Sequence, residues 1–302
     1  MNRNQIGSSD LYVGEIGLGC MSLGTEEKQA IRLVHEALEQ GINLLDTADL
    51  YDAGMNEELV GKALKGRRND VILATKVGNR RVPDQEGLVW DPSKEYIKAA
   101  AKESMRRLGT DYIDLYQLHG GTLDDPIDET IEAFEELKQE GWIRYYGISS
   151  IRPNVIREYV KRSNIVSVMM QYSILDRRPE EAVLPLLAEH GISVIARGPV
   201  AKGILSDRSE EKSAKGYLNY TKEDLLHVTK QLNKEFTPER TLSHTAIRYA
   251  LAHPAVACVI PGASSVDQLR HNAAAGDMEP LSPQEIQTIQ VISRANQYEQ
   301  HR

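Results

Sequence analysis

The sequence predicts an α/β fold in which eight parallel strands close into a (β/α)8 TIM barrel. Eight short apolar runs alternate with amphipathic helical stretches over most of the 302-residue chain, and such alternation is typical of parallel strands joined by crossover helices. The alternative is an open Rossmann-type sheet, which needs a Gly-x-Gly-x-x-Gly turn directly after its first strand. Here Gly17 and Gly19 lie inside the first apolar run, and Ser22 stands where the third glycine would be. The barrel is therefore favoured over the open sheet.

The eight apolar runs have the lengths of buried strands. In chain order they are Ile16–Met21, Ile42–Asp46, Val71–Lys76, Tyr112–His119, Ile143–Ser149, Val166–Gln171, Ile192–Arg197 and Ala255–Ile260. Between the runs, apolar residues recur at helical spacing, as in Ile31, Val34 and Leu38. Gly41 and Gly191 follow two of these stretches, as glycines do at helix C-termini. The spacing therefore predicts a helix after each strand.

Three segments lie outside the strand–helix repeat. Residues 5–15 have the pattern of a short hairpin, which we expect to cap the floor of the barrel. Residues 203–240 form a long connection after the seventh strand, with helical character around Leu225–Phe236, and the tail after Pro283 is expected to form a terminal helix. The chain shows no linker or low-complexity tract, so we expect one domain over residues 1–302.

Composition excludes several classes of function. Asp and Glu outnumber Lys and Arg by 44 to 36, for a formal net charge of -8, which gives no electrostatic reason to bind nucleic acid or an anionic membrane. No apolar run reaches membrane-spanning length, and the N-terminus lacks the apolar segment of a signal peptide. The two cysteines, Cys20 and Cys258, lack metal-ligand spacing and suit a reducing compartment. We therefore expect a soluble, cytoplasmic protein without a metal site.

Four polar residues that can do chemistry stand at or just beyond the ends of predicted strands. Asp46 ends the second strand and Tyr51 follows it, Lys76 ends the third strand, and His119 ends the fourth. The C-terminal ends of barrel strands meet at one rim, where the active sites of such barrels lie. We expect the four side chains to share that rim.

This set of side chains suits the reduction of a carbonyl group. Hydride transfer to a carbonyl leaves an alkoxide, which needs a proton as it forms. The Tyr51 phenol can supply the proton, and a nearby Lys76 ammonium would favour the phenolate left behind. Asp46 would hold Lys76 charged, and His119 would donate to the carbonyl oxygen. Taken singly, each residue has an ordinary structural role, such as a helix cap or a solvated charge.

Several long motifs resemble the aldo-keto reductase superfamily across nearly the whole chain. They are DTADLYDAGMNEELVGKAL (46–64), LATKVG (73–78), ESMRRLGTDYIDLYQLH (103–119), GISS (147–150) and IPGASSVDQLRHN (260–272). The resemblance implies a (β/α)8 barrel, NADP(H) bound along the rim, reduction of aldehydes or ketones, and a catalytic tetrad of Asp46, Tyr51, Lys76 and His119.

The resemblance also implies a set of cofactor-binding residues. They are Ser149 and Ser150 for the nicotinamide carboxamide, Gly203, Leu205 and Arg208 in the loop after the seventh strand, and Gly262, Ser264, Gln268 and Asn272 at the adenosine end. The second serine replaces an asparagine of the family pattern. The 262–272 segment opens a helix, whose N-terminus favours phosphate.

The sequence departs from the family pattern at four of the expected cofactor contacts. Met169 replaces the glutamine of a Gln-x-x-Tyr motif, and Gln171, on the same strand face, can take over its contact. Arg197 replaces the aromatic residue that stacks on the nicotinamide; its guanidinium can stack, or reach the pyrophosphate or a substrate carboxylate. Gln268 and His271 replace an arginine and a glutamate near the adenosine.

The missing arginine weakens the case for a strict preference for NADPH. Arg270 and the helix N-terminus can compensate for it, so we expect NADPH to be preferred, with NADH as the weaker alternative.

On the substrate side, Trp90 either lines the pocket or covers the barrel edge, and Gly120-Gly121 suggests an open mouth. The expected partner is a small-molecule carbonyl compound, and the expected oligomeric state is a monomer or a weak homo-oligomer. One alternative is a cofactor-binding regulatory subunit resembling potassium channel β subunits. Another is an aldolase with Lys76 as a Schiff-base lysine, which leaves Tyr51 and His119 unexplained.

Overall fold

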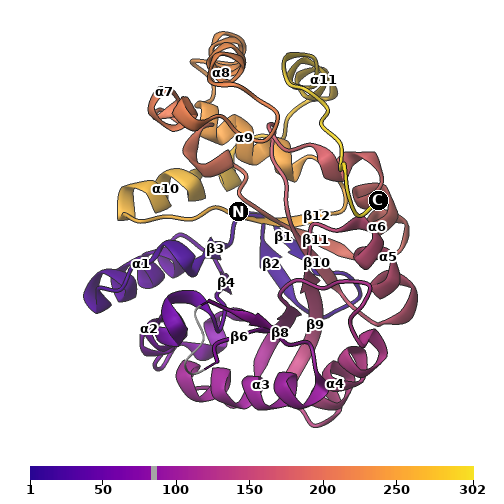
Figure 1. Ribbon diagram of the computed structural model, residues 1–302. Coiled ribbons are helices and arrows are strands. Elements are labelled where there is room, and N and C mark those ends of the chain that lie inside the picture. The colour runs from indigo at the N-terminus through magenta and orange to yellow at the C-terminus, as the bar shows by residue number, and fades with distance from the viewer. Residues whose placement is uncertain (83–86) are drawn as a thin grey trace.

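The computed structural model describes residues 1–82 and 87–302, and the strands form a parallel barrel surrounded by helices (Figure 1). Hydrogen-bonded neighbours follow the order β12-β11-β10-β9-β8-β5-β4-β3. The strands are β3 (Leu18–Gly19), β4 (Leu44–Asp46), β5 (Ile72–Val77), β8 (Ile113–Leu118), β9 (Ile143–Ser149), β10 (Ser167–Gln171), β11 (Ser193–Arg197) and β12 (Val256–Ile260). Parallel bridges from Ile16 to Val259 and from Gly19 to Gly262 join the two ends of the sheet. The predicted (β/α)8 barrel is confirmed.

Each predicted run contains one strand, but the first run is extended only in its middle. After β3 the chain turns into a short 3-10 helix, η1 (Cys20–Ser22), which the Leu23 N–H closes onto the Cys20 carbonyl. The prediction of a strand as far as Met21 was therefore wrong. The turn follows directly from Gly19, whose backbone pairs with Gly262 at the rim.

Helices cover the outside of the barrel, as Figure 1 shows. They are α1 (Glu27–Glu39), α2 (Met55–Ala63), α3 (Lys94–Leu108), α4 (Ile127–Gln139), α5 (Pro153–Arg162), α6 (Val183–Glu189), α9 (Leu242–Leu251) and α10 (Val266–Ala274). Local sequence fixes their ends: the Ser93 side chain caps the start of α3, and Gly109 ends it in the left-handed conformation. Each helix turns an apolar face toward the strands, as α1 does with Leu33 and Val34.

The N-terminal hairpin closes the floor of the barrel. Its strands β1 (Arg3–Gln5) and β2 (Tyr12–Gly14) pair antiparallel. Ile6, Leu11 and Val13 are buried in one cluster with side chains of the barrel interior. Burial of side chains of this size contributes about 1.5–3 kcal/mol each, so the hairpin is a stabilising part of the core. The predicted cap on the barrel floor is confirmed.

The other additions also match the sequence. The long connection after β11 contains α7 (Ser209–Lys212) and α8 (Lys222–Phe236), and the chain ends with α11 (Pro283–Ile292). Figure 1 shows α8 and α11 outside the ring of helices, next to α9. A small hairpin after β5, made of β6 (Asn79–Arg80) and β7 (Val89–Trp90), was not predicted. Among the described residues, no helix is long and apolar enough to cross a bilayer.

Candidate active site

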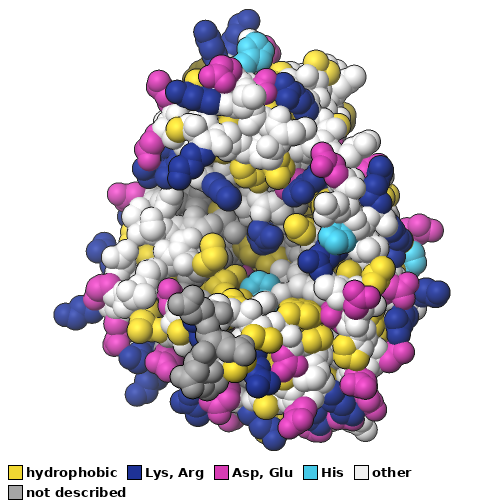
Figure 2. Space-filling view, in the orientation of Figure 1, with side chains coloured by type: hydrophobic (Ala, Val, Ile, Leu, Met, Phe, Trp, Pro, Cys, Tyr) yellow, Lys and Arg dark blue, Asp and Glu magenta, His cyan; other side chains and the backbone are white. Residues whose placement is uncertain are grey.

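A buried lysine joins three of the four predicted strand-end residues at the rim. The Lys76 ammonium donates to Asp46 Oδ2 at 2.6 Å, to the Thr47 carbonyl at 2.6 Å and to the Tyr51 hydroxyl at 3.4 Å. The Tyr51 ring meets the His119 ring edge to face, with centroids 6.2 Å apart. Figure 2 shows a hollow at the centre of this face, with basic and histidine side chains in and around it. The structure therefore brings the four residues together.

Strand register places Asp46 and Lys76 under this hollow. Asp46 lies beside Ala74 of β5, and Lys76, two residues further along β5, lies beside Gln117 of β8. The Gln117 side-chain amide donates to the second carboxylate oxygen of Asp46 at 3.3 Å. Sequence reasoning gave Gln117 no role, although its position next to Lys76 in the predicted sheet was the available signal.

Tyr51 is held by a tight left-handed turn. It begins η2 (Tyr51–Gly54), in which Asp52 and Ala53 have φ of 48° and 56° and Gly54 has φ of 91°. This conformation costs roughly 1–2 kcal/mol for a residue with a side chain. Surrounding contacts must therefore hold the turn, which carries the chain from the rim into α2 and leaves the Tyr51 ring facing Lys76.

Burial and charge set the protonation states of these groups. Burial works against the Lys76 ammonium, but Asp46 and Tyr51 outweigh it and raise the pKa of Lys76. Burial raises the pKa of Tyr51 above its usual 10.0, and Lys76 reduces that rise without cancelling it. Burial, with Lys76 and Arg197, lowers the pKa of His119 to about 3. At neutral pH the site therefore holds an ammonium, an intact phenol and a neutral imidazole.

Asp49 is a further acidic group behind the site that sequence reasoning left without a role. Its backbone N–H donates to the Lys76 carbonyl at 3.4 Å. Its buried Oδ1 atom has no hydrogen-bond partner among the described residues. Burial, together with the Glu57 carboxylate, raises the pKa of Asp49 to about 7. The predicted strand gave no sign of this group because its neighbours come from other helices.

Polar groups at the ends of β9, β10 and β11 form the part of the rim predicted to meet the nicotinamide. Ser149 and Ser150 are buried at the end of β9. Gln171 of β10 lies beside Arg197 of β11 and accepts from its guanidinium at 2.6 Å. The Gln171 amide donates in turn to the Tyr217 hydroxyl at 2.8 Å, a contact that sequence reasoning missed.

The neighbouring Met169 is buried among side chains of the barrel interior, two residues below Gln171 on the same strand. At this point the rim therefore presents the Gln171 amide.

The loop after β11 presents backbone and buried apolar groups more than a free cation. Gly203 has φ of 87°, a conformation that favours glycine. The Leu205 side chain is fully buried. Arg208 is exposed, and its guanidinium makes bidentate contacts to Glu211 at 2.8–3.0 Å. That carboxylate neutralises the cation predicted to meet the pyrophosphate.

The segment predicted to hold the adenosine end is ordered by its own polar side chains. The Gln268 side-chain oxygen accepts from the Ser264 N–H at 2.9 Å and from its hydroxyl at 3.2 Å. The Asn272 amide donates to the Gly262 carbonyl at 3.2 Å. A Cβ atom at position 262 would lie 2.3 Å from the Ser22 hydroxyl, so glycine is required there. Four of the predicted residues therefore form one connected loop before and along α10.

The two residues that depart from the family pattern next to this loop are engaged with other helices. Arg270 makes a bidentate ion pair with Glu36 of α1, at 2.7 and 3.0 Å. The His271 ring contacts the Ser243 hydroxyl at 2.6 Å and stacks on His244 with centroids 4.0 Å apart. The positive charge that was expected to compensate for the missing arginine is thus shared with Glu36.

Trp90 covers the rim beside His119. Its indole N–H donates to Asp125 at 2.9 Å, and its ring fills the space next to Gly78 and Gly120. A Cβ atom on Gly78 would come within 2.5 Å of the ring. The glycine after His119 therefore makes room for Trp90, and the expectation of an open mouth at Gly120 was wrong.

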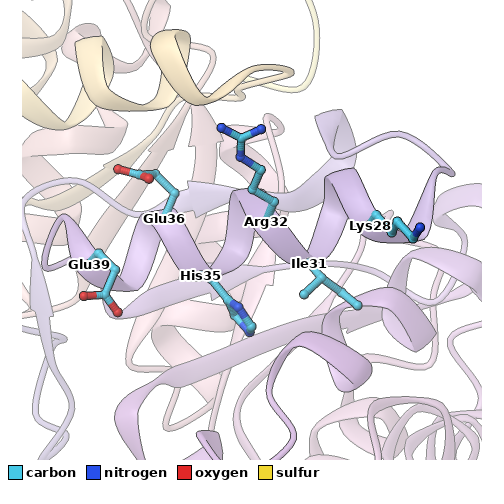
Figure 3. A pocket seen from close by; sticks show the side chains of 6 residues that line it. All are labelled: Lys28, Ile31, Arg32, His35, Glu36 and Glu39. Carbon is cyan, nitrogen blue, oxygen red and sulfur yellow. The ribbon is translucent and has the colours of Figure 1, made fainter.

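A second hollow lies on the outside of the barrel, along α1 (Figure 3). All the side chains that line it come from this helix, including Arg32, His35 and Glu36. Glu36 is bound to Arg270, and the His35 ring contacts the Ala63 carbonyl at 2.9 Å. These contacts explain the arrangement as packing of α1 against α10 and α2. The rim remains the candidate site.

The fold and this arrangement of side chains define the class of protein. A sequence model of the aldo/keto reductase family matches residues 15–294, and the chain belongs to that family. It is 58% identical over 307 aligned positions to the uncharacterized oxidoreductase YqkF of Bacillus subtilis (strain 168), with full coverage of both chains. The chain is therefore an oxidoreductase of the aldo/keto reductase family.

Solved structures agree with this assignment. The holo form of the aldo-keto reductase AKR11C1 from Bacillus halodurans is 63% identical and superposes with a TM-score of 0.95, covering 100% of this chain and 99% of the other. The apo form of AKR11C1 gives a TM-score of 0.86 with the same coverage. An aldo/keto reductase from Klebsiella pneumoniae, solved with NADP and acetate, is 27% identical with a TM-score of 0.81, covering 100% and 99% of the two chains.

Proposed function

We propose that this protein reduces small aldehydes or ketones to alcohols with NADPH, and that Tyr51 gives the carbonyl oxygen its proton. The observation that carries the proposal is the Lys76 ammonium, which contacts both Asp46 at 2.6 Å and the Tyr51 hydroxyl at 3.4 Å inside the rim. The reaction balances as one hydride to the carbonyl carbon and one proton to its oxygen, giving an alcohol and NADP⁺. The nicotinamide supplies the hydride when it is bound.

The protein groups handle the proton and the developing negative charge. Burial keeps Tyr51 a phenol at neutral pH, so its proton is available as the alkoxide forms. The phenolate that remains faces the Lys76 ammonium, which stabilises it, and Asp46 keeps that ammonium charged. The neutral His119 can donate a hydrogen bond to the carbonyl oxygen and hold it beside Tyr51.

The polar groups along the rim suit a nicotinamide dinucleotide. Amide and hydroxyl groups at one end can bind a carboxamide, and the start of α10 can bind phosphate. We assign the cofactor to Ser149, Ser150, Gln171, Arg197, Gly203, Leu205, Arg208, Gly262, Ser264, Gln268 and Asn272. The complex of the Klebsiella pneumoniae relative with NADP supports this choice. We favour NADPH, with NADH as the weaker alternative.

The remaining parts of the proposal concern the setting of the enzyme. We take residues 1–302 as one catalytic domain that works in the cytoplasm as a monomer or a weak homo-oligomer. Both cysteines are buried and unbonded, as suits a reducing compartment.

The test is the loss of NADPH absorbance with an activated aldehyde such as p-nitrobenzaldehyde. We expect turnover that saturates in both substrates. Binding of NADPH without turnover of this or other small carbonyl compounds would overturn the proposal. It would favour instead a cofactor-binding regulatory role like that of potassium channel β subunits.

We predict that Arg197→Ala weakens NADPH binding by roughly tenfold, because it removes a charged contact worth about 1.5 kcal/mol or more. Fluorescence titration with NADPH and NADH would measure both dissociation constants. Arg157→Ala, an exposed arginine on α5, is the matched control and should bind as the wild type does. Unchanged affinity in Arg197→Ala would assign the guanidinium to the substrate or to solvent.

We predict that neither His119 nor Tyr51 causes an inflection in kcat/KM for reduction between about pH 5 and pH 9. The pKa of His119 lies near 3, so the ring stays neutral above that value, and burial keeps the pKa of Tyr51 above 10.0. Comparison with Asp49→Asn separates the titration of Asp49, whose pKa is about 7. An inflection in this range that persists in Asp49→Asn would contradict the prediction.

A further inference from the structure

A buried ion pair ties the helix after Tyr51 to the strand that carries Lys76. Glu57, in the first turn of α2, is fully buried. One of its carboxylate oxygens accepts from the Arg107 guanidinium of α3 at 2.7 Å, and the other accepts from the Thr75 hydroxyl at 2.6 Å. Thr75 immediately precedes Lys76 in β5. One carboxylate therefore links α2, α3 and β5 directly beneath the rim.

The same arginine passes under the turn that holds Tyr51. A Cβ atom on Gly54 would lie 2.9 Å from Arg107 Cδ and 3.1 Å from its Nε, so this glycine leaves room for the side chain. Asp52, Ala53 and Gly54 are all left-handed, and such a run persists only where its surroundings fix it. The Arg107 side chain is one of those surroundings, and it couples the turn to Glu57.

A second tether acts on the neighbouring strand ends. Asn56, next to Glu57, accepts from the Thr47 hydroxyl at 2.7 Å and donates to the Cys20 carbonyl at 2.9 Å. Thr47 follows Asp46, and its own carbonyl accepts from Lys76. The first turn of α2 thus holds the ends of β3, β4 and β5 at fixed distances from the Tyr51 turn.

Stability alone does not account for a charged pair at this place. Burying two charges costs desolvation, and an apolar pair of similar volume is often equally or more stabilising. Charged hydrogen bonds differ from apolar contacts in direction, because each one fixes a single atom at 2.6–2.7 Å. Such fixing matters where a small displacement changes a rate.

We propose that Glu57 and Arg107 are a positioning pair that sets the separation of the Tyr51 hydroxyl and the Lys76 ammonium. The pair touches neither substrate nor cofactor and acts through the two residues it positions. This role rests on the proposed reductase function.

The test is the double variant Glu57→Gln/Arg107→Met. It keeps the net charge, and the amide oxygen left at position 57 can still accept from Thr75, so only the ion pair is lost. We expect kcat with p-nitrobenzaldehyde to fall by about tenfold or more, since a displacement of the order of 1 Å can cost about a hundredfold. KM for NADPH should stay unchanged, because the proposed cofactor residues lie on other strands.

The pKa of Tyr51 gives a second readout that does not depend on turnover. It can be followed by NMR of protein labelled with 13C at tyrosine Cζ, with the resonance assigned by its loss in Tyr51→Phe. Lys76 lowers the pKa of Tyr51 in the intact site, so a weakened contact should raise it. A double variant that folds and keeps both the wild-type kcat and the wild-type Tyr51 pKa would overturn the proposal.

Two further variants complete the design. Glu103→Gln/Arg106→Met removes an exposed ion pair on the same helix, with N···O of 2.9 Å, and should change neither readout. Thr75→Val cuts the other contact of Glu57 without removing a charge, and should shift both readouts even if the double variant fails to fold. If the wild type shows no Tyr51-dependent turnover, the reductase function fails, while the Tyr51 pKa still decides whether the pair positions it.

Discussion

Tyr51→Phe should reduce turnover by roughly 10²- to 10⁴-fold, the usual contribution of a positioned general acid. The substitution removes one hydroxyl and keeps the ring that meets His119 edge to face. Lys76 loses its longest contact, at 3.4 Å, and keeps both contacts at 2.6 Å, so the fold should be unchanged. Steady-state kinetics with p-nitrobenzaldehyde and a fluorescence titration with NADPH are the measurements.

NADPH affinity should be the same in Tyr51→Phe and the wild type, which separates chemistry from binding. Tyr12→Phe is the matched control, because Tyr12 is exposed on the floor hairpin, away from the rim. Full activity in Tyr51→Phe would remove this residue from the acid role. Loss of activity together with loss of NADPH binding would indicate a disturbed site.

Lys76→Met should abolish turnover and lower the free energy of unfolding by about 3–5 kcal/mol, the usual cost of leaving one partner of a buried ion pair alone. Lys76 and Asp46 are 1% and 3% exposed, so solvent cannot compensate the orphaned carboxylate. The phenolate of Tyr51 would also lose its stabilising cation. Denaturant unfolding and the aldehyde assay measure the two effects.

The stability of Lys76→Met should depend on pH in a defined direction. Burial raises the pKa of Asp46, and Lys76 opposes that rise. Without Lys76 the folded chain binds the Asp46 proton more tightly than the unfolded chain does. Its stability should therefore fall as the pH rises above the unfolded value of about 3.9.

Asp46→Asn/Lys76→Met should recover most of the stability without recovering activity. If the single variant proves as stable as the wild type at pH 8, the buried ion pair does not contribute as described.

Local patterns were sufficient to predict the barrel. The β9 strand has the same limits as its apolar run, Ile143–Ser149, and α8 covers the predicted Leu225–Phe236. Both features follow from periodicity within one segment. The first run misled because its apolar character continues through η1, where Cys20 is buried in a turn instead of a strand.

The tetrad was also predictable, because all four residues mark the ends of strands that share one rim. Ion pairs between distant segments were not. Glu57 and Arg107 are 50 positions apart, and Glu36 and Arg270 are 234 positions apart. No periodicity links such pairs, so the sequence showed Arg270 as a cation available for phosphate.

The hairpin under the barrel has an electrical consequence. Ile6, Leu11 and Val13 fill the bottom of the interior, and Met169 and Ile195 continue the apolar column toward the rim. Field lines from the Lys76 ammonium therefore run downward through weakly polarisable matter and are screened by solvent mainly from the mouth. Charges at the rim interact more strongly in such a medium than they would in water. The floor of the barrel thus acts as an insulator for the proton transfer above it.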